Sequence, residues 1–358
     1  MRYILTAIIL LQLLLSLSAF AEDSIKVLML RSAYDTLPSD RAELVDTLKG
    51  RIFINGEFYS GELEILRDGK GLYVVNNVPF EKYIVGVVYS ELGKDWELEA
   101  LKAQAVISRT YALYHKNVQA GKNYHLTSSE LHQLYRNTNA GPIVRLAVRV
   151  TEGQVLSYDG EPIKAFYHST CEGKTELPDE VWGEKYPYIK SVSCNSNNSP
   201  FGNWQRRFTL RELQRALKIK TIEDIDIASY TQTGRVKTVQ LLLAASENNS
   251  AFYDISATRL RRVLGYRELP STQFSLKKTG EQIIFAGEGY GHGVGLSQWG
   301  AFAMAREGKN YREILSHYYP DTQLVSNEEL HFKAGTDKPQ GNKISKYLHP
   351  HPEEPISQ

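Results

Sequence analysis

Residues 80–92 have the sequence FEKYIVGVVYSEL, and the apolar spacing in this stretch predicts an amphipathic helix. On a helical wheel, Ile84, Val87 and Val88 form one apolar stripe. Glu91 falls on the same stripe, where a carboxylate is costly unless it is paired, hydrogen-bonded or neutral. Burial raises the pKa of a carboxyl group, as a general acid that works near neutral pH requires. Glu91 is therefore a candidate catalytic residue, and the alternative is a local structural role in the last helical turn.

A second predicted helix follows Gly93 and carries two cations on its apolar stripe. Lys102 and Arg109 lie on this stripe among the leucine, alanine and valine side chains of residues 98–113. Cations on an inward face need anions, which are Glu91, another buried carboxylate or a bound ligand. The opposite face of the helix is apolar as well, so a buried helix with a structural ion pair is the alternative.

Residues 287–300 have the sequence GEGYGHGVGLSQWG, in which glycines alternate with other residues. Such a loop lets the backbone approach a ligand closely, and Ser297 is a plausible N-cap for a following helix. His292 would then be the polar tip of a ligand-binding loop. The stretch is not a Walker loop, because no Gly-Lys-Ser/Thr follows, and it misses the G-x-S-x-G nucleophile elbow by one residue.

The composition of the 358-residue chain excludes some classes of protein. With 42% hydrophobic and 23% charged residues it can bury a core, so disorder throughout is excluded. The formal net charge of +1 argues against a nucleic-acid partner, because such proteins carry a basic excess. Aromatic residues make up 11%, with 22 tyrosines, which favours sugars or peptides as ligands.

Residues 1–21 have the pattern of a signal peptide. A positive start is followed by an apolar run from Ile4 to Leu17 and by the small-residue site Ala19-Phe20-Ala21. The run is short for a membrane span, and an uncleaved N-terminal anchor is the alternative. We therefore expect an exported protein with one domain over residues 22–332. The tail 333–358 is rich in Gly, Pro, Lys and Gln and is predicted to be disordered.

Export bears on the oxidation state of the two cysteines, Cys171 and Cys194. In an oxidising compartment two such thiols most often pair, and closing this loop is worth about 3 kcal/mol on the chain-entropy model. His168 precedes Cys171 by three residues, so an open metal site made of His168, Cys171 and Cys194 is the alternative to a disulfide.

The remaining patterns predict an α+β fold with mixed short β-strands, a buried central helical pair over 80–117 and a C-terminal helical segment. Strands are expected at 25–30, 51–59 and 236–244, a hairpin at 63–75, short strands over 140–166, and helices at 210–217, 256–264 and in two pieces between 295 and Pro320.

Five blocks of the sequence resemble the SpoIID family (stage II sporulation protein D), and they occur in the family's order. They are residues 80–92, 98–106 with 108–113, 168–171, 180–183 with Cys194, and 291–301. The resemblance spans roughly residues 50–325. This sequence departs from the family pattern at Glu172, where a second glycine is expected beside Gly173, and it has no further cysteine after Cys194.

The resemblance implies a lytic transglycosylase that acts on peptidoglycan glycan strands, preferentially those stripped of stem peptides. The family's catalytic glutamate corresponds to Glu91. One carboxyl group is enough for this reaction, because the muramic 6-hydroxyl attacks internally and the same residue can act as acid and then as base. The product is a 1,6-anhydromuramic end. The implied location is the periplasm or cell envelope.

Further roles follow from the resemblance as hypotheses. Lys102 and Arg109 would hold the lactyl carboxylate of muramic acid or tune Glu91. Other substrate-binding candidates are Tyr111, His168, His292, Ser297 and Gln298. Some relatives bind zinc with His and Cys of the third block, but here no cofactor is expected to be required and the disulfide is favoured over a metal. Two alternatives to the transglycosylase are a wall-binding protein that stimulates a cell-wall amidase and a metal-dependent hydrolase centred on His168, Cys171 and Cys194.

Overall fold

The computed structural model describes residues 23–29, 37–39, 41–54, 56–129, 132–136, 140–196, 199–243 and 251–330. The predicted signal peptide and C-terminal tail lie outside these ranges. The fold is α+β, as predicted. Contacts divide the chain into two compact units. Among the described residues, the first contains those up to Glu91 and those within 115–140, and the second contains Leu92–Tyr114 and those from Gly141 to Leu330. Within the described ranges, no helix has the length and apolar character that crossing a membrane requires.

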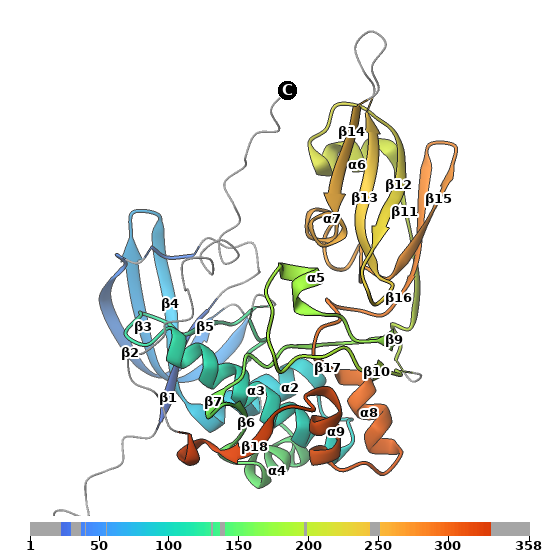
Figure 1. Cartoon of the computed structure of the whole chain (residues 1–358). Coiled ribbons are helices and arrows are strands. Elements are labelled where there is room, and N and C mark those ends of the chain that lie inside the picture. Colours follow the sequence, from blue (N-terminus) through green and yellow to red (C-terminus); the bar gives the residue numbers. More distant parts are fainter. Residues whose placement is uncertain are drawn as a thin grey trace, which may run out of the picture. The chain divides into compact units, whose positions relative to one another are not determined.

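A five-stranded sheet dominates the first unit (Figure 1, mostly blue). Its strand order is β2-β3-β4-β1-β5, antiparallel except for the parallel pair β1–β5. The strands are β1 (Ser24–Leu28), β2 (Glu43–Ile54), β3 (Glu57–Asp68), β4 (Gly71–Pro79) and β5 (Leu126–Thr127).

The two hairpins of this sheet test the strand predictions. The hairpin expected at 63–75 is confirmed, and Asp68 Oδ1 closes its turn by accepting the N–H of Lys70 at 2.8 Å. The single strand expected at 51–59 is wrong, because the chain reverses at Gly56 between β2 and β3. The sequence Asn55-Gly56 is a strong hairpin signal, and it explains the reversal.

The central helical pair is confirmed as α2 (Phe80–Leu92) and α3 (Leu98–Val118). The short strands expected from residue 140 are wrong over the first part of that range. Residues Pro142–Val150 form helix α4, with Pro142 at a first-turn position where its missing N–H costs nothing. Val144, Ala147 and Val148 are buried at helical spacing, which is the pattern that the prediction overlooked.

An inserted module, defined here as residues 203–288, forms a separate part of the second unit (Figure 1, green-yellow to orange). Two three-stranded sheets, β12-β13-β14 and β11-β16-β15, share a core with helices α6 and α7. The predicted helices and the buried strand of this module are confirmed. Its elements are β11 (Asn203–Thr209), α6 (Leu210–Leu217), β12 (Ile222–Tyr230), β13 (Val236–Leu243), β14 (Ala251–Ser256), α7 (Ala257–Leu264), β15 (Phe274–Thr279) and β16 (Gln282–Glu288).

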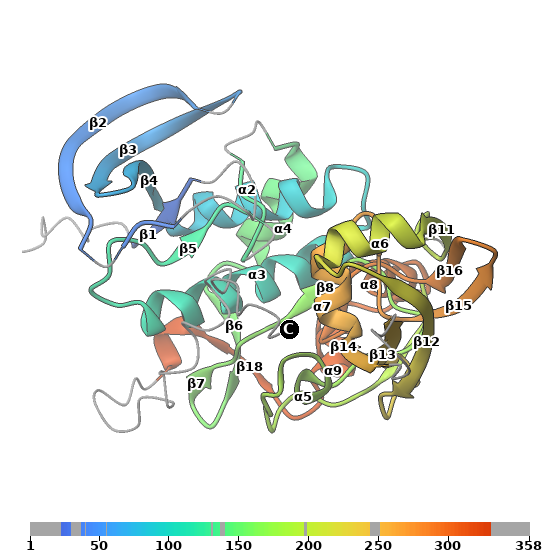
Figure 2. The same cartoon turned by 90° about the horizontal axis from the view of Figure 1, so that it is seen from above.

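The rest of the second unit packs around α3, and Figure 2 shows this region from a second direction. The two C-terminal helices are confirmed as α8 (Gln298–Arg306) and α9 (Tyr311–Tyr318). The other elements are β6 (Gln154–Tyr158), β7 (Glu161–Pro162), β8 (Tyr167–His168), β9 (Gly173–Lys174), α5 (Pro178–Trp182), β10 (Ser193–Cys194), β17 (Leu296–Ser297), β18 (Gln323–Ser326) and the 3-10 turn η1 (Asn327–Glu329).

Candidate functional site

Glu91 lies in the last turn of α2, on the stripe that the helical wheel predicts. Ile84, Val87 and Val88 on this stripe are fully buried, while Glu91 is half-buried. The main-chain N–H of Leu134 donates a hydrogen bond to Glu91 Oε1 at 2.9 Å. A carboxylate that accepts a main-chain N–H is held in one orientation at the edge of an apolar face.

The segment 132–136 that holds Glu91 is fixed along α2 by two features of the first unit. A Cβ at Gly86 would lie 2.7 Å from the Tyr135 ring, so only glycine lets the segment come this close. Tyr83 Oη donates to Gln133 Oε1 at 3.0 Å, and both side chains have no exposed surface. A glycine within an apolar helix face is a sequence signal of close packing, but it does not indicate that residues 132–136 are the segment that packs there.

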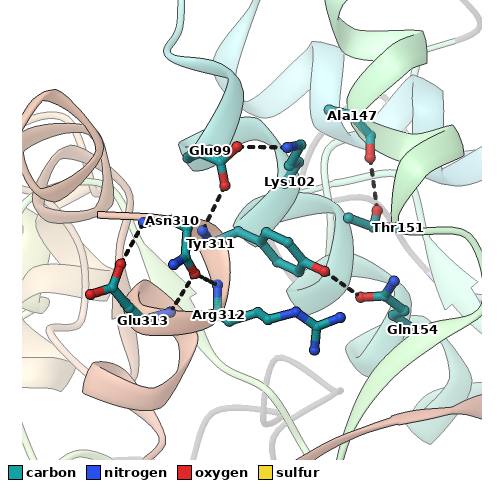
Figure 3. Close-up of polar contacts among 9 residues, drawn as sticks. All are labelled: Glu99, Lys102, Ala147, Thr151, Gln154, Asn310, Tyr311, Arg312 and Glu313. Carbon is teal, nitrogen blue, oxygen red and sulfur yellow. Dashed lines mark hydrogen bonds and ion pairs between the residues drawn. The ribbon is translucent and has the colours of Figure 1, made fainter. Parts of the chain in front are cut away.

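Lys102 is paired within its own helix, and Figure 3 shows the arrangement. Its Nζ lies 2.6 Å from Glu99 Oε1, an i,i+3 pair. Glu99 Oε2 in turn accepts the main-chain N–H of Tyr311 at 2.8 Å, and Tyr311 Oη donates to Gln154 Oε1 at 2.9 Å. The anion opposite Lys102 is therefore a carboxylate of the protein, and the pair joins α3 to the start of α9.

Arg109 has no exposed surface. Its Nη1 donates to the Gln154 carbonyl at 3.1 Å and its Nη2 to the Val148 carbonyl at 3.4 Å. Val148 lies in the last turn of α4, where carbonyls lack helical partners and a cation is favourable. Tyr111 on the same helix is also buried, and burial raises the pKa of its hydroxyl. Both side chains are part of the interior of the second unit.

The parallel pair β8–β17 places His168 opposite Ser297. His168 is 4% exposed, and its Nδ1 lies 3.1 Å from the Val294 carbonyl. Burial, together with the neighbouring His292 and Arg235, holds the pKa of His168 well below its usual value. The two imidazole rings lie with their centroids 5.6 Å apart.

His292 is half-buried in the glycine-rich loop. Its Nδ1 accepts the main-chain N–H of Val294 at 3.1 Å, which assigns the ring proton to Nε2. Burial and the positive charge of Arg261 lower the pKa of His292 to about 3, against a smaller opposing effect of the Tyr167 carbonyl. His292 is therefore a neutral imidazole near pH 7 and offers hydrogen bonds rather than charge.

Ser297 is the N-cap of α8, as predicted: its Oγ accepts the N–H of Gly300 at 3.2 Å. The hydroxyl has no exposed surface and also lies 3.3 Å from Ser196 Oγ. The next residue, Gln298, is 7% exposed, and its Nε2 lies 3.5 Å from Gln104 Oε1 of α3. These two side chains connect the loop to the helices that surround it.

The glycine-rich loop runs close to the protein's own backbone. At Gly295, with φ 71°, a Cβ would lie 2.1 Å from the Phe166 carbonyl oxygen. At Gly293, with φ 85°, a Cβ would lie 2.8 Å from the centre of the Arg235 guanidinium. Both glycines are therefore needed for packing within the second unit. These contacts do not test the prediction that the loop approaches a ligand closely.

Cys171 and Cys194 are both free thiols and buried, at 0% and 6% exposure. Cys194 Sγ donates to the Cys171 carbonyl at 3.4 Å. The predicted disulfide between them stays a prediction. Over the described ranges, no three His, Cys, Asp or Glu side chains gather as a metal site would require, so the set of His168, Cys171 and Cys194 does not fit the zinc alternative.

Two groups of aromatic rings, each with half-buried members, were not predicted. The first group contains Trp96, Trp299 and Phe302, with ring centroids 4.9–5.2 Å apart. In the second, Trp182 stacks on Phe166 at 4.7 Å and lies 5.0 Å from the His292 ring. Aromatic faces of this kind are suited to contacts with sugar rings, because they offer apolar area beside polar groups.

The predicted site residues thus fall into three sets. Within the second unit the structure brings together the third block and the glycine-rich loop, with His168, His292, Cys171, Cys194 and Ser297. Arg109 and Tyr111 are buried in the same unit and Lys102 is half-buried there, while Gln298 joins the loop to α3. Glu91 belongs to the first unit with its partner Leu134.

Comparison with known families gives two matches. Residues 68–158 match the family SpoIID, described as Stage II sporulation protein, and residues 188–295 match a domain of unknown function (DUF8618). The first match contains α2, α3 and Glu91. The second contains the inserted module and most of the glycine-rich loop.

Several curated proteins are similar over most of this chain. A Bacillus subtilis protein named Stage II sporulation protein D is 33% identical over 268 residues, which are 70% of this chain and 75% of that protein. An uncharacterized protein of Brachyspira hyodysenteriae is 33% identical over 279 residues, 76% of this chain and 73% of that protein. A Bacillus subtilis protein named Amidase enhancer is 30% identical over 289 residues, 67% of this chain and 40% of that protein.

Proposed function

Because the chain belongs to the stage II sporulation protein D family, we propose that it is a peptidoglycan lytic transglycosylase with Glu91 as its general acid and base. The substrate is the MurNAc–GlcNAc bond of glycan strands that have lost their stem peptides. The observation that carries the proposal is the placement of Glu91, a half-buried carboxyl on an apolar helix face that the Leu134 N–H holds in one orientation.

The reaction needs one carboxyl group in two protonation states. In the first step, Glu91 gives its proton to the oxygen of the leaving GlcNAc while the bond from this oxygen to C1 of MurNAc breaks. In the second step, the C6 hydroxyl of the same MurNAc attacks C1, and the Glu91 carboxylate takes the hydroxyl proton. The products are a 1,6-anhydromuramic end and a free GlcNAc hydroxyl, and no water is consumed.

Neutral hydrogen-bonding groups and aromatic faces in the second unit support a sugar ligand. Near neutral pH, His292 offers a polar group without charge, and Trp182 lies 5.0 Å from its ring. Trp299 and Trp96 provide further half-buried aromatic faces. In this proposal Lys102 and Arg109 support the fold rather than hold the lactyl carboxylate, because each already has partners in the protein.

The proposal is tested with purified protein and glycan strands, with and without prior amidase treatment, followed by mass spectrometry of the products. We expect anhydromuramic products from amidase-treated strands and none with Glu91→Gln. Glu97→Gln is the matched control, because Glu97 is an exposed glutamate in the loop that follows α2. Anhydromuramic products at an undiminished rate with Glu91→Gln would refute the assignment of the general acid.

A second candidate is a wall-binding protein that stimulates a cell-wall amidase. It is favoured by the similarity to the protein named Amidase enhancer, of which this chain covers 40%. In that case the wild-type protein and Glu91→Gln would both bind strands, neither would form anhydro ends, and both would raise the rate of an added amidase equally.

The same proposal places the mature protein in the periplasm or cell envelope, because its substrate is the cell wall. Cell fractionation and N-terminal sequencing of the envelope protein test this. The expected first residue is Glu22. A protein that starts at Met1 in the soluble cytoplasmic fraction would contradict it.

A further inference from the structure

A buried arginine next to the third block has no role in the proposed reaction. Arg235 is 2% exposed and directly precedes β13 of the inserted module. Its Nη2 donates to Cys171 Sγ at 3.7 Å, while Nε and Nη1 are buried without a hydrogen-bond partner among the described residues. A buried guanidinium is costly unless something nearby balances its charge.

The turn that carries Arg235 is bound tightly to the glycine-rich loop. Thr231 and Thr233 both donate to Glu176 Oε2, at 2.7 and 2.6 Å. The main-chain N–H of Glu176 donates to the Gly293 carbonyl at 2.8 Å. The guanidinium itself lies against Gly293, where a side chain would leave no room for it. One turn of the module therefore contacts both Glu176 and Gly293, the two residues that this main-chain hydrogen bond joins.

The same guanidinium explains why a metal does not fit here. A metal ion bound by His168 and Cys171 would bring a second cation to a sulfur that already accepts from Arg235. Two positive charges that contact the same sulfur atom repel strongly in a buried site. Consistently, the described residues around Cys171 do not assemble three ligands for a metal ion.

We propose that Arg235 is a positioning residue that replaces a metal ion as the cation of the third block. Its guanidinium, between Cys171 Sγ and Gly293, holds the Cys171 loop against the glycine-rich loop. The function of the inserted module in this proposal is to supply the Arg235 guanidinium to the third block. The inference goes beyond the proposed transglycosylase activity and does not depend on it.

The proposal also bears on the state of the cysteines. In the reduced protein the Cys171 sulfur accepts a hydrogen bond from Arg235, and the Cys194 thiol donates to the Cys171 carbonyl. A disulfide would remove the Cys194 S–H and with it the hydrogen bond to the Cys171 carbonyl. We therefore expect both thiols to stay reduced, the opposite of the pairing that the cysteine spacing predicts.

Two measurements on the wild-type protein test the proposal without any variant. After purification in zinc-containing buffer and gel filtration, elemental analysis should find well under one zinc per chain, and EDTA should leave the melting temperature unchanged. After unfolding without reductant, Ellman's reagent should find both cysteine thiols. One tightly held zinc per chain with a melting temperature that EDTA lowers, or the absence of free thiols, would overturn the proposal.

Variants test whether Arg235 itself positions the loop. In Arg235→Met we expect alkylation of Cys171 in the folded protein to become at least about tenfold faster, because the loop opens locally. Arg235→Lys should restore part of the protection. The matched control is Arg261→Met, since Arg261 is a buried arginine of the same module whose Nε donates to the carbonyls of Leu269 and Pro270. Equal alkylation rates in both methionine variants would refute a specific role of Arg235.

Discussion

Replacing Arg109 by methionine distinguishes a ligand-binding cation from a structural one. Arg109 has no exposed surface, and its guanidinium donates to the carbonyls of Gln154 and Val148. Methionine fills a similar length of the buried space but donates nothing. Both carbonyls would then lose a charged donor in the interior, at the end of α4 and the start of β6.

The size of the effect follows from these two hydrogen bonds. A hydrogen bond to a charged group contributes about 1.5–3 kcal/mol, so losing two should lower the free energy of unfolding by roughly 3–6 kcal/mol. For domains of about 150–250 residues each kcal/mol shifts the melting temperature by about 2–4 °C, which gives a drop of roughly 6–24 °C.

Differential scanning calorimetry measures this drop, and Lys102→Met is the control. The Lys102 side chain is 18% exposed and paired at i,i+3, so its removal should cost about 1 kcal/mol or less. If Arg109→Met instead melted within about 2 °C of the wild type and mainly weakened glycan binding, Arg109 would be a ligand-binding residue and the structural argument would be wrong.

Two further predictions concern the glycine-rich loop and the histidines. Gly295→Ala should prevent stable folding, because its Cβ would lie 2.1 Å from the Phe166 carbonyl, whereas Gly183→Ala has open space and should cost only about 1 kcal/mol in a thermal melt. Lowering the pH from 7 to 5 should destabilise the protein. His168 and His292 stay neutral in the fold while the unfolded chain takes up protons below about pH 6.5, so stability falls from there toward pH 3. The loss at pH 5 should be about 2 kcal/mol for His292, whose pKa is about 3, and His168 adds to it in the same direction. Urea unfolding at both pH values measures this loss, and equal stability at both would contradict it.

The sequence patterns predicted elements best where periodicity was long or turn chemistry was explicit. The helices that contain Glu91 and Arg109 follow from apolar spacing, and the hairpin at Asp68 follows from its turn residues. Residues 140–150 were misassigned, because a short amphipathic helix and short strands have similar compositions. The strand predicted at 51–59 is wrong because the Asn55-Gly56 turn signal outweighs the alternation of apolar residues on either side of it.

The sequence pattern indicates candidate residues for the site but not their partners. Glu91 stood out as a misplaced carboxylate, yet its hydrogen bond comes from the main chain of Leu134, 43 residues further along, which no side-chain pattern can indicate. The cations Lys102 and Arg109 were correctly placed on an inward face. Their partners, Glu99 and two carbonyls, depend on tertiary packing that the helical wheel does not contain.

The inserted module begins and ends on paired residues, since Asn203 of β11 lies opposite Glu288 of β16. A segment with adjoining ends can be gained or lost in one genetic event, and a short turn can bridge the gap that it leaves. Because the module supplies Arg235, such a deletion would also remove the positive charge beside Cys171. A deletion of the module would therefore change the length of the chain and the chemistry around Cys171 together.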